Sequence, residues 1–413
     1  MAEYFDTYET QAPEVREASL LGDLPRQIAH AKGNTAFFGK MLAGVEPGDI
    51  TSREALAQLP VTYKSDLIEA QAANPPFGGL NASPPGEMLH LFLSPGPIAE
   101  PEGRKTDWWR GARSLFAAGF RKGDILTNTF SYHFTPAGLL VDNAARALGC
   151  AVFPGGVGQT ERQVEAIQWY GINGFMGTPD FLKIVLDKAD ELGADISSLT
   201  KALVGAGALP PSLRQEIIAR GISCVQNYGT ADLGVVAYES QAMEGMILSE
   251  GLIVEIVRPG TGEPVAEGEV GEVVVTQIWN TDYPLIRFAT GDLSAFMPGL
   301  SPCGRTAPRI KGWMGRADQA AKVRGMFVRP TQIAGILQRH SEIVKARVVI
   351  GNENRRDTMV FKAEVDGQPD GLADAIATSI ADTIRSRADR VELVPVGSLP
   401  NDGIVIQDTR TYD

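Results

Sequence analysis

The chain has 413 residues, of which 44% are hydrophobic and 21% are charged, and its formal net charge is −12. This composition is typical of a globular protein, so a largely disordered chain is excluded. The excess of acidic residues argues against a general binder of nucleic acid or of an anionic membrane surface. The length predicts two or three domains, or one large domain with an appendage.

Three cysteines, Cys150, Cys224 and Cys303, lie far apart in the sequence. Their odd number and wide spacing argue against a disulfide framework, and the absence of a CxxC pair excludes a zinc ribbon. The N-terminal stretch is acidic and polar and lacks the basic start and apolar run of a signal peptide. No window of about 18 uncharged apolar residues predicts a membrane span. We therefore expect a cytoplasmic protein that binds neither membranes nor nucleic acid.

The first 75 residues predict helices, over residues 24–42 and 62–73, followed by a loop rich in Pro, Gly and Asn over residues 74–85. From there short apolar runs alternate with amphipathic runs. The predicted strands are 88–93, 124–130, 150–154, 174–177, 202–205 and 224–228, and the predicted helices are 107–118, 136–148, 160–170, 179–191 and 211–219. This alternation implies right-handed crossovers and a largely parallel sheet covered by helices.

After Gly234 the pattern changes to short β runs at 252–257, 271–277 and 286–288, which suggest antiparallel ribbons. From about Gly315 onward, strands and two helices, at 330–339 and 371–387, predict a small α+β unit. We expect an α/β fold with a large N-terminal domain over residues 1–316. It would combine mainly parallel, helix-covered sheets with a small β subdomain. A small α+β domain would follow over residues 317–413.

Ligands of an open parallel sheet bind beyond the carboxyl ends of its strands. Residues 204–208 (VGAGA) follow one such strand and carry almost no side chain, so a flat ring or a phosphate could approach the backbone there. A simple tight turn has the same composition. Residues 226–232 (QNYGTAD) follow the next strand and offer an aromatic ring for stacking and a carboxylate for Mg²⁺. A core tyrosine followed by a helix-capping aspartate would give the same pattern.

Two further segments stand out. Residues 283–293 (YPLIRFATGDL) place Asp292 after a Thr-Gly turn, where its carboxylate could accept two hydrogen bonds from a ribose diol or simply complete a β-turn. Residues 315–318 (GRAD) and 322–325 (KVRG) lie where the composition shifts from the large region to the small one. Taken alone, they also fit an ordinary charged linker.

In this order and spacing, the four segments resemble the adenylate-forming acyl-CoA ligase superfamily, and within it the phenylacetate–CoA ligase branch. Supporting stretches are GCAVFPGGVGQTERQ, FMGTP, IRFATGDL and CGRTAPRIKGWMGRAD. The resemblance implies that a carboxylic acid and ATP form an acyl-adenylate, with Mg²⁺ as metal, and that the acyl group then passes to CoA. It also implies a hinge between the two domains, an aryl acid such as phenylacetate as substrate, and a homodimer as one form of assembly.

Residue roles follow from the resemblance only where motifs match. Tyr228 would stack on adenine and Asp292 would hold the ribose, while Asp318 would be the hinge residue. Asp232 stands where the family has a glutamate that helps to place Mg²⁺, and Thr230 would replace the phosphate-contacting hydroxyl that Ala231 lacks. The other implied nucleotide-binding residues are Gly205, Ala206, Gly207, Ala208, Asn227, Gly229 and Arg316. The implied acyl-pocket residues are His133, Phe134, Ala137, Gly155 and Gly156, although a lone histidine is more often structural.

The phosphate loop departs from the family pattern. The family has a Ser/Thr/Gly-rich loop that ends in Lys-Pro, whereas residues 94–101 read SPGPIAEP. Ser94 and Gly96 match, but Glu100 stands at the lysine position and would repel a triphosphate. Pro95 and Pro97 have no backbone N–H to offer. The loop therefore should not cradle the terminal phosphates in the usual way.

The tail departs as well, because residues 399–408 contain no lysine where the family has a catalytic Gly-Lys pair. Two hypotheses follow. The first is an acid–CoA ligase with atypical phosphate contacts, in which Arg104 or Lys105 supplies the missing charge. The second is an adenylation-impaired homologue that binds AMP or acyl-CoA as a sensor or partner subunit, or that performs only thiol transfer. ATP or AMP, CoA and a small carboxylic acid are the expected ligands.

Overall fold

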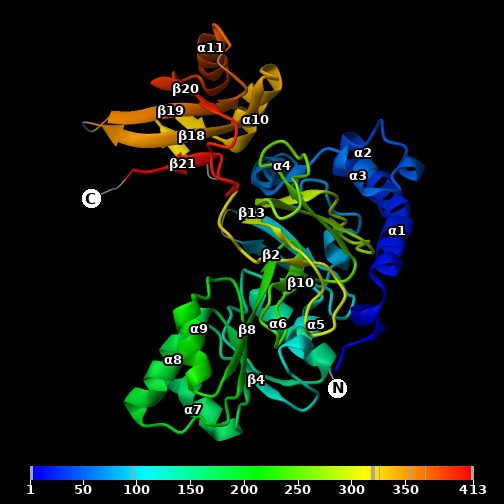
Figure 1. The fold of residues 1–413 in the computed structure, drawn as a ribbon. Coiled ribbons are helices and arrows are strands. Elements are labelled where there is room, and N and C mark those ends of the chain that lie inside the picture. Colours follow the sequence, from blue (N-terminus) through cyan, green and yellow to red (C-terminus); the bar gives the residue numbers. More distant parts are fainter. Residues whose placement is uncertain are drawn as a thin grey trace.

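The computed structural model describes residues 3–94, 97–317, 321–324, 326–353, 356–367 and 369–410 (Figure 1). It is a mixed α/β fold, as the sequence predicts. Residues before the first sheet form four short 3₁₀ turns and four helices. These are η1 (Thr7–Thr10), α1 (Pro13–Asn34), α2 (Ala36–Met41), η2 (Pro47–Asp49), α3 (Arg53–Ala57), η3 (Lys64–Asp66), α4 (Leu67–Ala73) and η4 (Pro85–Glu87).

Two details of this region differ from the sequence prediction. The helix predicted over residues 24–42 is two helices, because Thr35 adopts an extended conformation and its Oγ1 accepts a hydrogen bond from the backbone N–H of Phe38, which starts α2. The helix predicted over residues 62–73 begins only at Leu67. Before it, strand β1 (Thr62–Tyr63) pairs with a distant strand, and η3 follows at once. Lys64 therefore lies at the end of a strand.

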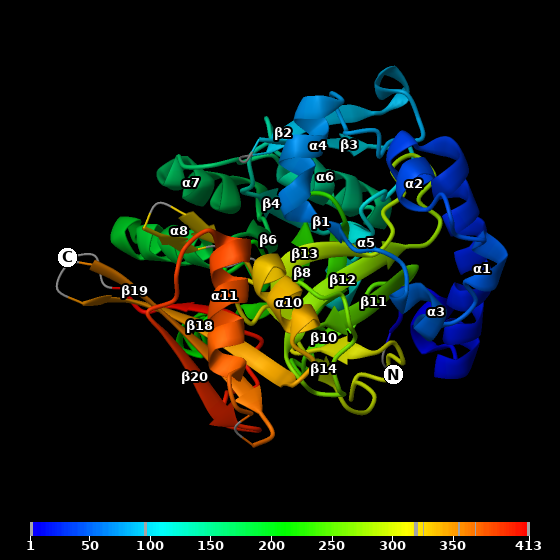
Figure 2. The same cartoon turned by 90° about the horizontal axis from the view of Figure 1, so that it is seen from above.

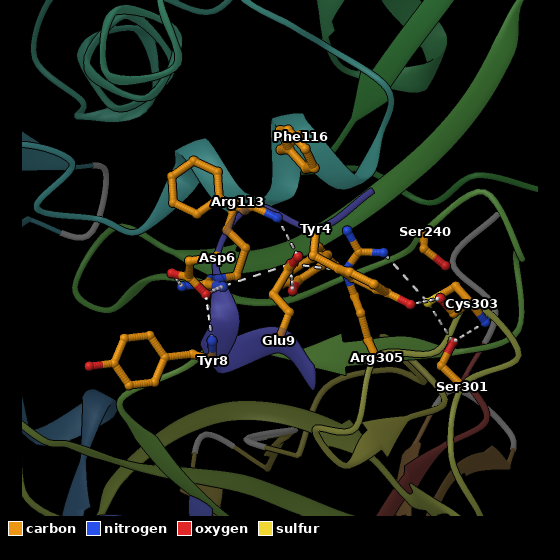
Figure 3. Close-up of polar contacts among 12 residues, drawn as sticks. Tyr4, Asp6, Tyr8, Glu9, Arg113, Phe116, Ser240, Ser301, Cys303 and Arg305 are labelled. Atoms are coloured by element: carbon orange, nitrogen blue, oxygen red, sulfur yellow. Dashed lines mark hydrogen bonds and ion pairs between the residues drawn. The ribbon is translucent and has the colours of Figure 1, made fainter. Parts of the chain in front are cut away.

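The N-terminal segment is tied to the large domain by the buried carboxylate of Glu9 (Figure 3). Its Oε1 accepts hydrogen bonds from Arg305 Nε at 2.8 Å and from the Tyr238 hydroxyl at 3.0 Å. Beyond Arg305, the Cys303 thiol contacts the Ser301 hydroxyl at 3.1 Å. Within the described residues no group of three or more His, Cys, Asp or Glu side chains is placed to hold a metal ion.

The largest sheet has nine strands in the order β14-β15-β10-β9-β8-β7-β6-β4-β5. Five of them are parallel: β4 (Ile125–Asn128), β5 (Ala151–Phe153), β6 (Gly174–Gly177), β7 (Lys201–Val204) and β8 (Ser223–Thr230). The helices of this region are α5 (Gly111–Ala117), α6 (Ala137–Leu148), α7 (Thr160–Tyr170), α8 (Pro179–Leu192) and α9 (Pro211–Ala219). The remaining strands are antiparallel: β9 (Gly234–Tyr238), β10 (Met246–Leu248), β14 (Phe296–Met297) and β15 (Arg309–Ile310). Strand β8 is thus the seam between the parallel and antiparallel halves.

A second sheet has the order β1-β13-β12-β11, formed with β11 (Leu252–Val257), β12 (Gly271–Gln277) and β13 (Phe288–Ser294). Apolar side chains from β8, β9 and β10 and from the second sheet share one buried cluster with the N-terminal helices. This packing holds the end of β8 close to β13. A separate two-stranded hairpin, β2 (His90–Ser94) and β3 (Ile98–Glu102), follows the N-terminal helices and contains the predicted phosphate loop.

The C-terminal part has its own buried core. Its elements are β16 (Ala321–Val323), β17 (Met326–Val328), α10 (Pro330–Arg339), β18 (Ile343–Glu353), β19 (Arg356–Val365), α11 (Leu372–Ile384), β20 (Arg390–Pro395) and β21 (Ile406–Asp408). The four-stranded sheet β20-β19-β18-β21 carries α10 and α11. It lies at the top of the molecule in Figure 1, and Figure 2 looks down on this end. The predicted boundary at 316/317 falls beside residues 318–320, which lie outside the described ones, so it stays a prediction. Among the described helices none is long and apolar enough to cross a membrane.

Candidate active site

Tyr228 and Asp292 meet where the two large sheets adjoin. Tyr228 lies near the end of β8 and Asp292 lies on β13, and the tyrosine hydroxyl donates to Asp292 Oδ2 at 3.0 Å. The same hydroxyl lies 3.1 Å from the Thr290 hydroxyl. Burial, followed by the nearby Asp292 carboxylate, raises the pKa of Tyr228 well above its usual value, so the hydroxyl stays protonated and donates. Two residues that the sequence placed on one nucleoside are therefore adjacent.

The second oxygen of Asp292 faces two further donors. Arg316 Nη1 lies 2.9 Å and Trp313 Nε1 lies 3.0 Å from Asp292 Oδ1. Asp292 and Arg316 also form an isolated β-bridge, which fixes the Gly-Arg-Ala stretch beside β13. The Arg316 side chain is 44% exposed, whereas the Asp292 side chain keeps 9% of its surface. A carboxylate held by three donors at the rim can exchange one of them for a ribose hydroxyl.

A cavity of about 280 Å³ opens beside the end of β8. The cavity is lined mostly by small and apolar residues from the ends of neighbouring parallel strands and from the start of α6. None of the described lining residues is charged. The lining residues are Ser94, Phe130, Thr135, Pro136, Ala137, Leu140, Val141, Met176, Gly205, Ala206, Asn227, Gly229, Thr230, Ala231, Gly234 and Val235. Such a cavity suits an uncharged, compact group.

Two glycines that line this cavity have no room for a side chain. A Cβ on Gly229 would lie 2.4 Å from the carbonyl oxygen of Gly234, and one on Gly205 would lie 2.3 Å from Asn227 Oδ1. Next to Gly205, Ala206 has a φ of +57°, in the left-handed region that few non-glycine residues adopt. The backbone after β7 and β8 is thus exposed to whatever the cavity holds.

The structure brings part of the predicted site to this cavity and places other residues elsewhere. Ser94, Ala137, Gly205, Ala206, Asn227, Gly229 and Thr230 line it, whereas Gly207 and Ala208 do not. His133 and Phe134 are exposed, and Phe134 accepts a backbone hydrogen bond from Leu93 on β2. Gly155 lies against Gln163, and Gly156 has open space around it. Asp318 and Gly96 lie outside the described residues.

Lys64 is a candidate that the sequence analysis missed. Its Nζ lies 2.7 Å from Asp232 Oδ2, and the Asp232 side chain has no exposed surface. The pairing depends on β1, which lies alongside β13 in parallel with Tyr63 opposite Ala289. Because residues 62–73 read as a single helix, their sequence gave no reason to direct Lys64 towards the end of β8. Only the alternation of Val61, Thr62 and Tyr63, which is weak, could have indicated the strand.

Asp232 is the residue expected to place Mg²⁺, and in this structure it fits an ammonium partner better than a metal. Lys64 takes one carboxylate oxygen, and the other, Oδ1, is enclosed without a hydrogen-bond partner in the described part of the chain. A cation already balances the charge, and Asp232 is not among the cavity-lining residues. Asp232 as a ligand of Mg²⁺ therefore stays a prediction from the sequence.

The described residues of the predicted phosphate loop belong to the β2–β3 hairpin, in which Ser94 ends β2 and residues 98–101 lie in β3. Ser94 pairs with Ile98 and Phe92 pairs with Glu100 across the two strands. Glu100 has no exposed surface, and the Ser94 hydroxyl donates to its Oε2 at 2.8 Å. Burial, and then the nearby Asp232 carboxylate, raise the pKa of Glu100 to about 7. The residue at the lysine position is thus turned inward as a buried carboxyl group.

Neither cation suggested as a replacement lies at this cavity. The Arg104 guanidinium donates to the backbone carbonyls of Glu87 and Met88, at 2.9 and 3.3 Å. Lys105 lines a different cavity of about 310 Å³, together with Trp108 and Trp279. The cation next to the predicted metal residue is Lys64.

The tail turn, residues 399–405, lies against β13. Ile404 packs onto a buried cluster that contains Val270 and Leu293, and the latter directly follows Asp292. Lys345 on β18 holds the turn by donating to the Pro400 carbonyl at 2.8 Å. At the position where the resemblance predicts a catalytic lysine, this chain therefore has an apolar contact between its C-terminal part and β13.

Comparison with known proteins shows the family to which this chain belongs. The model of the family described as AMP-binding enzyme matches residues 110–281. A phenylacetate-coenzyme A ligase of Aromatoleum evansii is 30% identical over 87% of this chain and 83% of its own length. One of Pseudomonas putida is 33% identical over 79% of this chain and 76% of its own length. The chain belongs to the phenylacetate-coenzyme A ligase family.

A solved structure with the same fold supports this family assignment. It is an open conformation of 2-hydroxyisobutyryl-CoA ligase in complex with 2-HIB-AMP and CoA, with a TM-score of 0.71 and 25% identity. The likeness covers 95% of this chain and 91% of that one. Family membership therefore extends to the C-terminal part, although the tail lysine and the loop lysine are absent from this family member.

Proposed function

We propose that this chain is an AMP-forming acid–CoA ligase, which converts a small carboxylic acid to an acyl-adenylate and then to a CoA thioester. The observation that carries the proposal is that two parts of the site follow each other directly along β8. Tyr228 faces the Asp292–Arg316 cluster, while the next residues, Gly229 and Thr230, line the uncharged cavity. A nucleoside held by the first part would present its phosphate to an acyl group in the second.

The chemistry needs this arrangement because a carboxylate is a poor acyl donor until its oxygen is attached to a better leaving group such as AMP. Positive charge near the phosphorus stabilises the transition state of that step. We assign this charge to Lys64, which lies next to Asp232 just beyond the end of β8. The hypothesis of an adenylation-impaired homologue is not favoured, because the relatives that are at least 30% identical are ligases.

The cavity indicates the kind of acid. Its volume of about 280 Å³ and its apolar walls suit an aryl acid or a short branched aliphatic acid and disfavour a second charged group. Phenylacetate and 2-hydroxyisobutyrate are the first acids to test, because similar proteins carry those names.

The test measures AMP formation with ATP, CoA and a panel of aryl and short aliphatic acids. We expect acid-dependent turnover above about 0.1 s⁻¹, at the slow end of ordinary enzymes. Lys64→Met should reduce this turnover strongly. Lys105→Met is the matched control, because it removes an exposed lysine that lines the other cavity. The absence of acid-dependent AMP formation across the panel would contradict the proposal.

A further inference from the structure

The hydroxyl of Ser94 and the carboxyl of Glu100 form a pair that leads from the cavity into the protein interior. Ser94 lines the cavity at the end of β2, and its Oγ donates to Glu100 Oε2 on β3 at 2.8 Å. Glu100 itself has no exposed surface and does not line the cavity. Among the described residues, Ser94 therefore links a group bound in the cavity to Glu100.

Glu100 is a buried carboxyl group without a cation of its own. Its Oε1 has no hydrogen-bond partner among the residues that the structure describes. The charged and titratable groups that face it are Lys64 from η3, Asp232 from the loop after β8, and Tyr283 from the loop before β13. Lys64 directs its ammonium to Asp232. Nothing described therefore locks Glu100 in its charged form by direct ion pairing, and the group can exchange a proton.

From this geometry we propose that Ser94 and Glu100 form a proton relay for the thioester-forming step. The inference rests on the proposed function and deepens it. As the CoA sulfur attacks the acyl carbon, a C–S bond forms and the bond from that carbon to the AMP oxygen breaks. The thiol proton passes to Ser94 Oγ while the Ser94 proton passes to Glu100 Oε2, and AMP leaves with the electron pair of the broken bond. Glu100 returns its proton to water after product release.

The acid–base properties of the two groups fit this role. A free thiol has a pKa near 8.5, so most of the CoA is protonated at neutral pH and a positioned base is useful. A base works best when its own pKa lies near the working pH, and such catalysis contributes about 10²- to 10⁴-fold. The pKa of Glu100, raised to about 7, meets that condition. A lysine at the same position would hold a proton and could not accept one, so the exchange to glutamate changes the function of the position.

The test isolates the second half-reaction by mixing synthetic phenylacetyl-adenylate and CoA with the full chain and measuring thioester formation from pH 6 to 9.5. Glu100→Gln keeps the size of the side chain and an oxygen that accepts from Ser94 but removes the base. We expect its rate at pH 7 to fall about 100-fold, and the deficit to shrink above about pH 8.5, where the thiol ionises unaided. Ser94→Ala should show the same pH-dependent deficit, whereas Glu100→Asp should keep the wild-type pH profile at a reduced rate.

Glu102→Gln is the matched control. Glu102 lies two residues further along the same face of β3, is equally buried, and pairs with His90 instead of a cavity-lining residue. It should transfer within about twofold of the wild type at every pH. A Glu100→Gln rate equal to the wild-type rate, or a deficit of the same size at pH 6.5 and pH 9, would overturn the relay. A purely structural effect predicts the second of these results.

A measurement without turnover separates the relay from the proposed function. The infrared difference spectrum between wild type and Glu100→Gln reports protonation of this carboxyl group, and we expect it to titrate near pH 7. Titration below pH 5 overturns the relay whatever the activity. A chain whose Glu100 titrates near 7, yet which forms no thioester from phenylacetyl-adenylate and also no AMP from the acid panel, contradicts the proposed function. If Glu100→Gln does not fold, the pH profiles of Glu100→Asp and Ser94→Ala test the relay in its place.

Discussion

Lys64 Nζ and Asp232 Oδ2 lie 2.7 Å apart although 168 positions separate the two residues in the sequence. The pair joins the N-terminal region, through β1 and η3, to the loop that follows β8. The Asp232 side chain is fully buried, while the Lys64 side chain keeps a quarter of its surface. The cation that pairs with Asp232 is therefore supplied by a segment that carries none of the recognised motifs.

Removing this lysine should affect stability as well as adenylation. In Lys64→Met the buried Asp232 carboxylate is left without a counterion, which typically costs about 3–5 kcal/mol of unfolding free energy. Adding Asp232→Asn should restore most of that stability, because no buried charge then remains, but it should not restore adenylation. Urea denaturation and AMP-formation assays of the two single variants and the double variant check both effects. A double variant as unstable as Lys64→Met would show that the pair is not the cause.

Tyr228 should contribute to nucleotide binding mainly through its ring. Tyr228→Ala removes the aromatic face and should weaken AMP binding by about 5- to 150-fold, corresponding to about 1–3 kcal/mol of base stacking. Tyr228→Phe keeps the ring and removes only the hydroxyl that donates to Asp292, so its affinity for AMP should stay within about fivefold of the wild type. Calorimetric titration with AMP distinguishes the two. Equal losses in both variants would mean that the hydroxyl, and hence the position of Asp292, dominates binding.

The cavity should determine which acids are accepted. Ala137 lies at the start of α6 and lines the cavity, so Ala137→Phe would fill a large part of it and should raise the KM for aryl acids at least 10-fold. Acetate, which is smaller, should be affected less. His133→Ala changes an exposed side chain in the same loop and serves as the control. Kinetics over an acid panel check this, and a larger effect of His133→Ala than of Ala137→Phe would place the acyl group next to His133 instead of in this cavity.

Glu100 should make stability depend on pH. Its pKa is raised from 4.5 to about 7 in the folded state, so between those values the folded chain keeps a proton that the unfolded chain releases. The wild type should therefore lose stability as the pH rises from about 4.5 to 7, by roughly 3–4 kcal/mol at most, since the pKa differs by about 2.5 between the two states. Glu100→Gln has no carboxyl proton to release and therefore does not show this loss of stability. Urea denaturation at pH 5 and pH 8 should show the variant gaining on the wild type, and a pH-independent difference would contradict the assignment.

The sequence by itself determined the family, the α/β class and most strands and helices of the parallel half. These features are local, because hydrophobic periodicity, turn residues and short motifs report on neighbouring residues along the chain. It also predicted that Tyr228 and Asp292 belong to one site, since both lie at motif positions, and it shows that residues 94–101 and 399–408 contain no lysine. Its reading of residues 62–73 as one helix was wrong, and that error concealed Lys64.

The tertiary structure alone decided which groups meet at the site. Two residues pair as β1 because β13 offers a free edge, and no local pattern encodes an edge that lies more than 200 residues away. The same applies to Glu100. The sequence shows a carboxylate where the resemblance predicts a lysine. Only the hairpin and the packing around it bury this group, hydrogen-bond it to Ser94 and raise its pKa to about 7. Burial and charge proximity are properties of the folded chain, and they change the chemistry of a side chain without changing its identity.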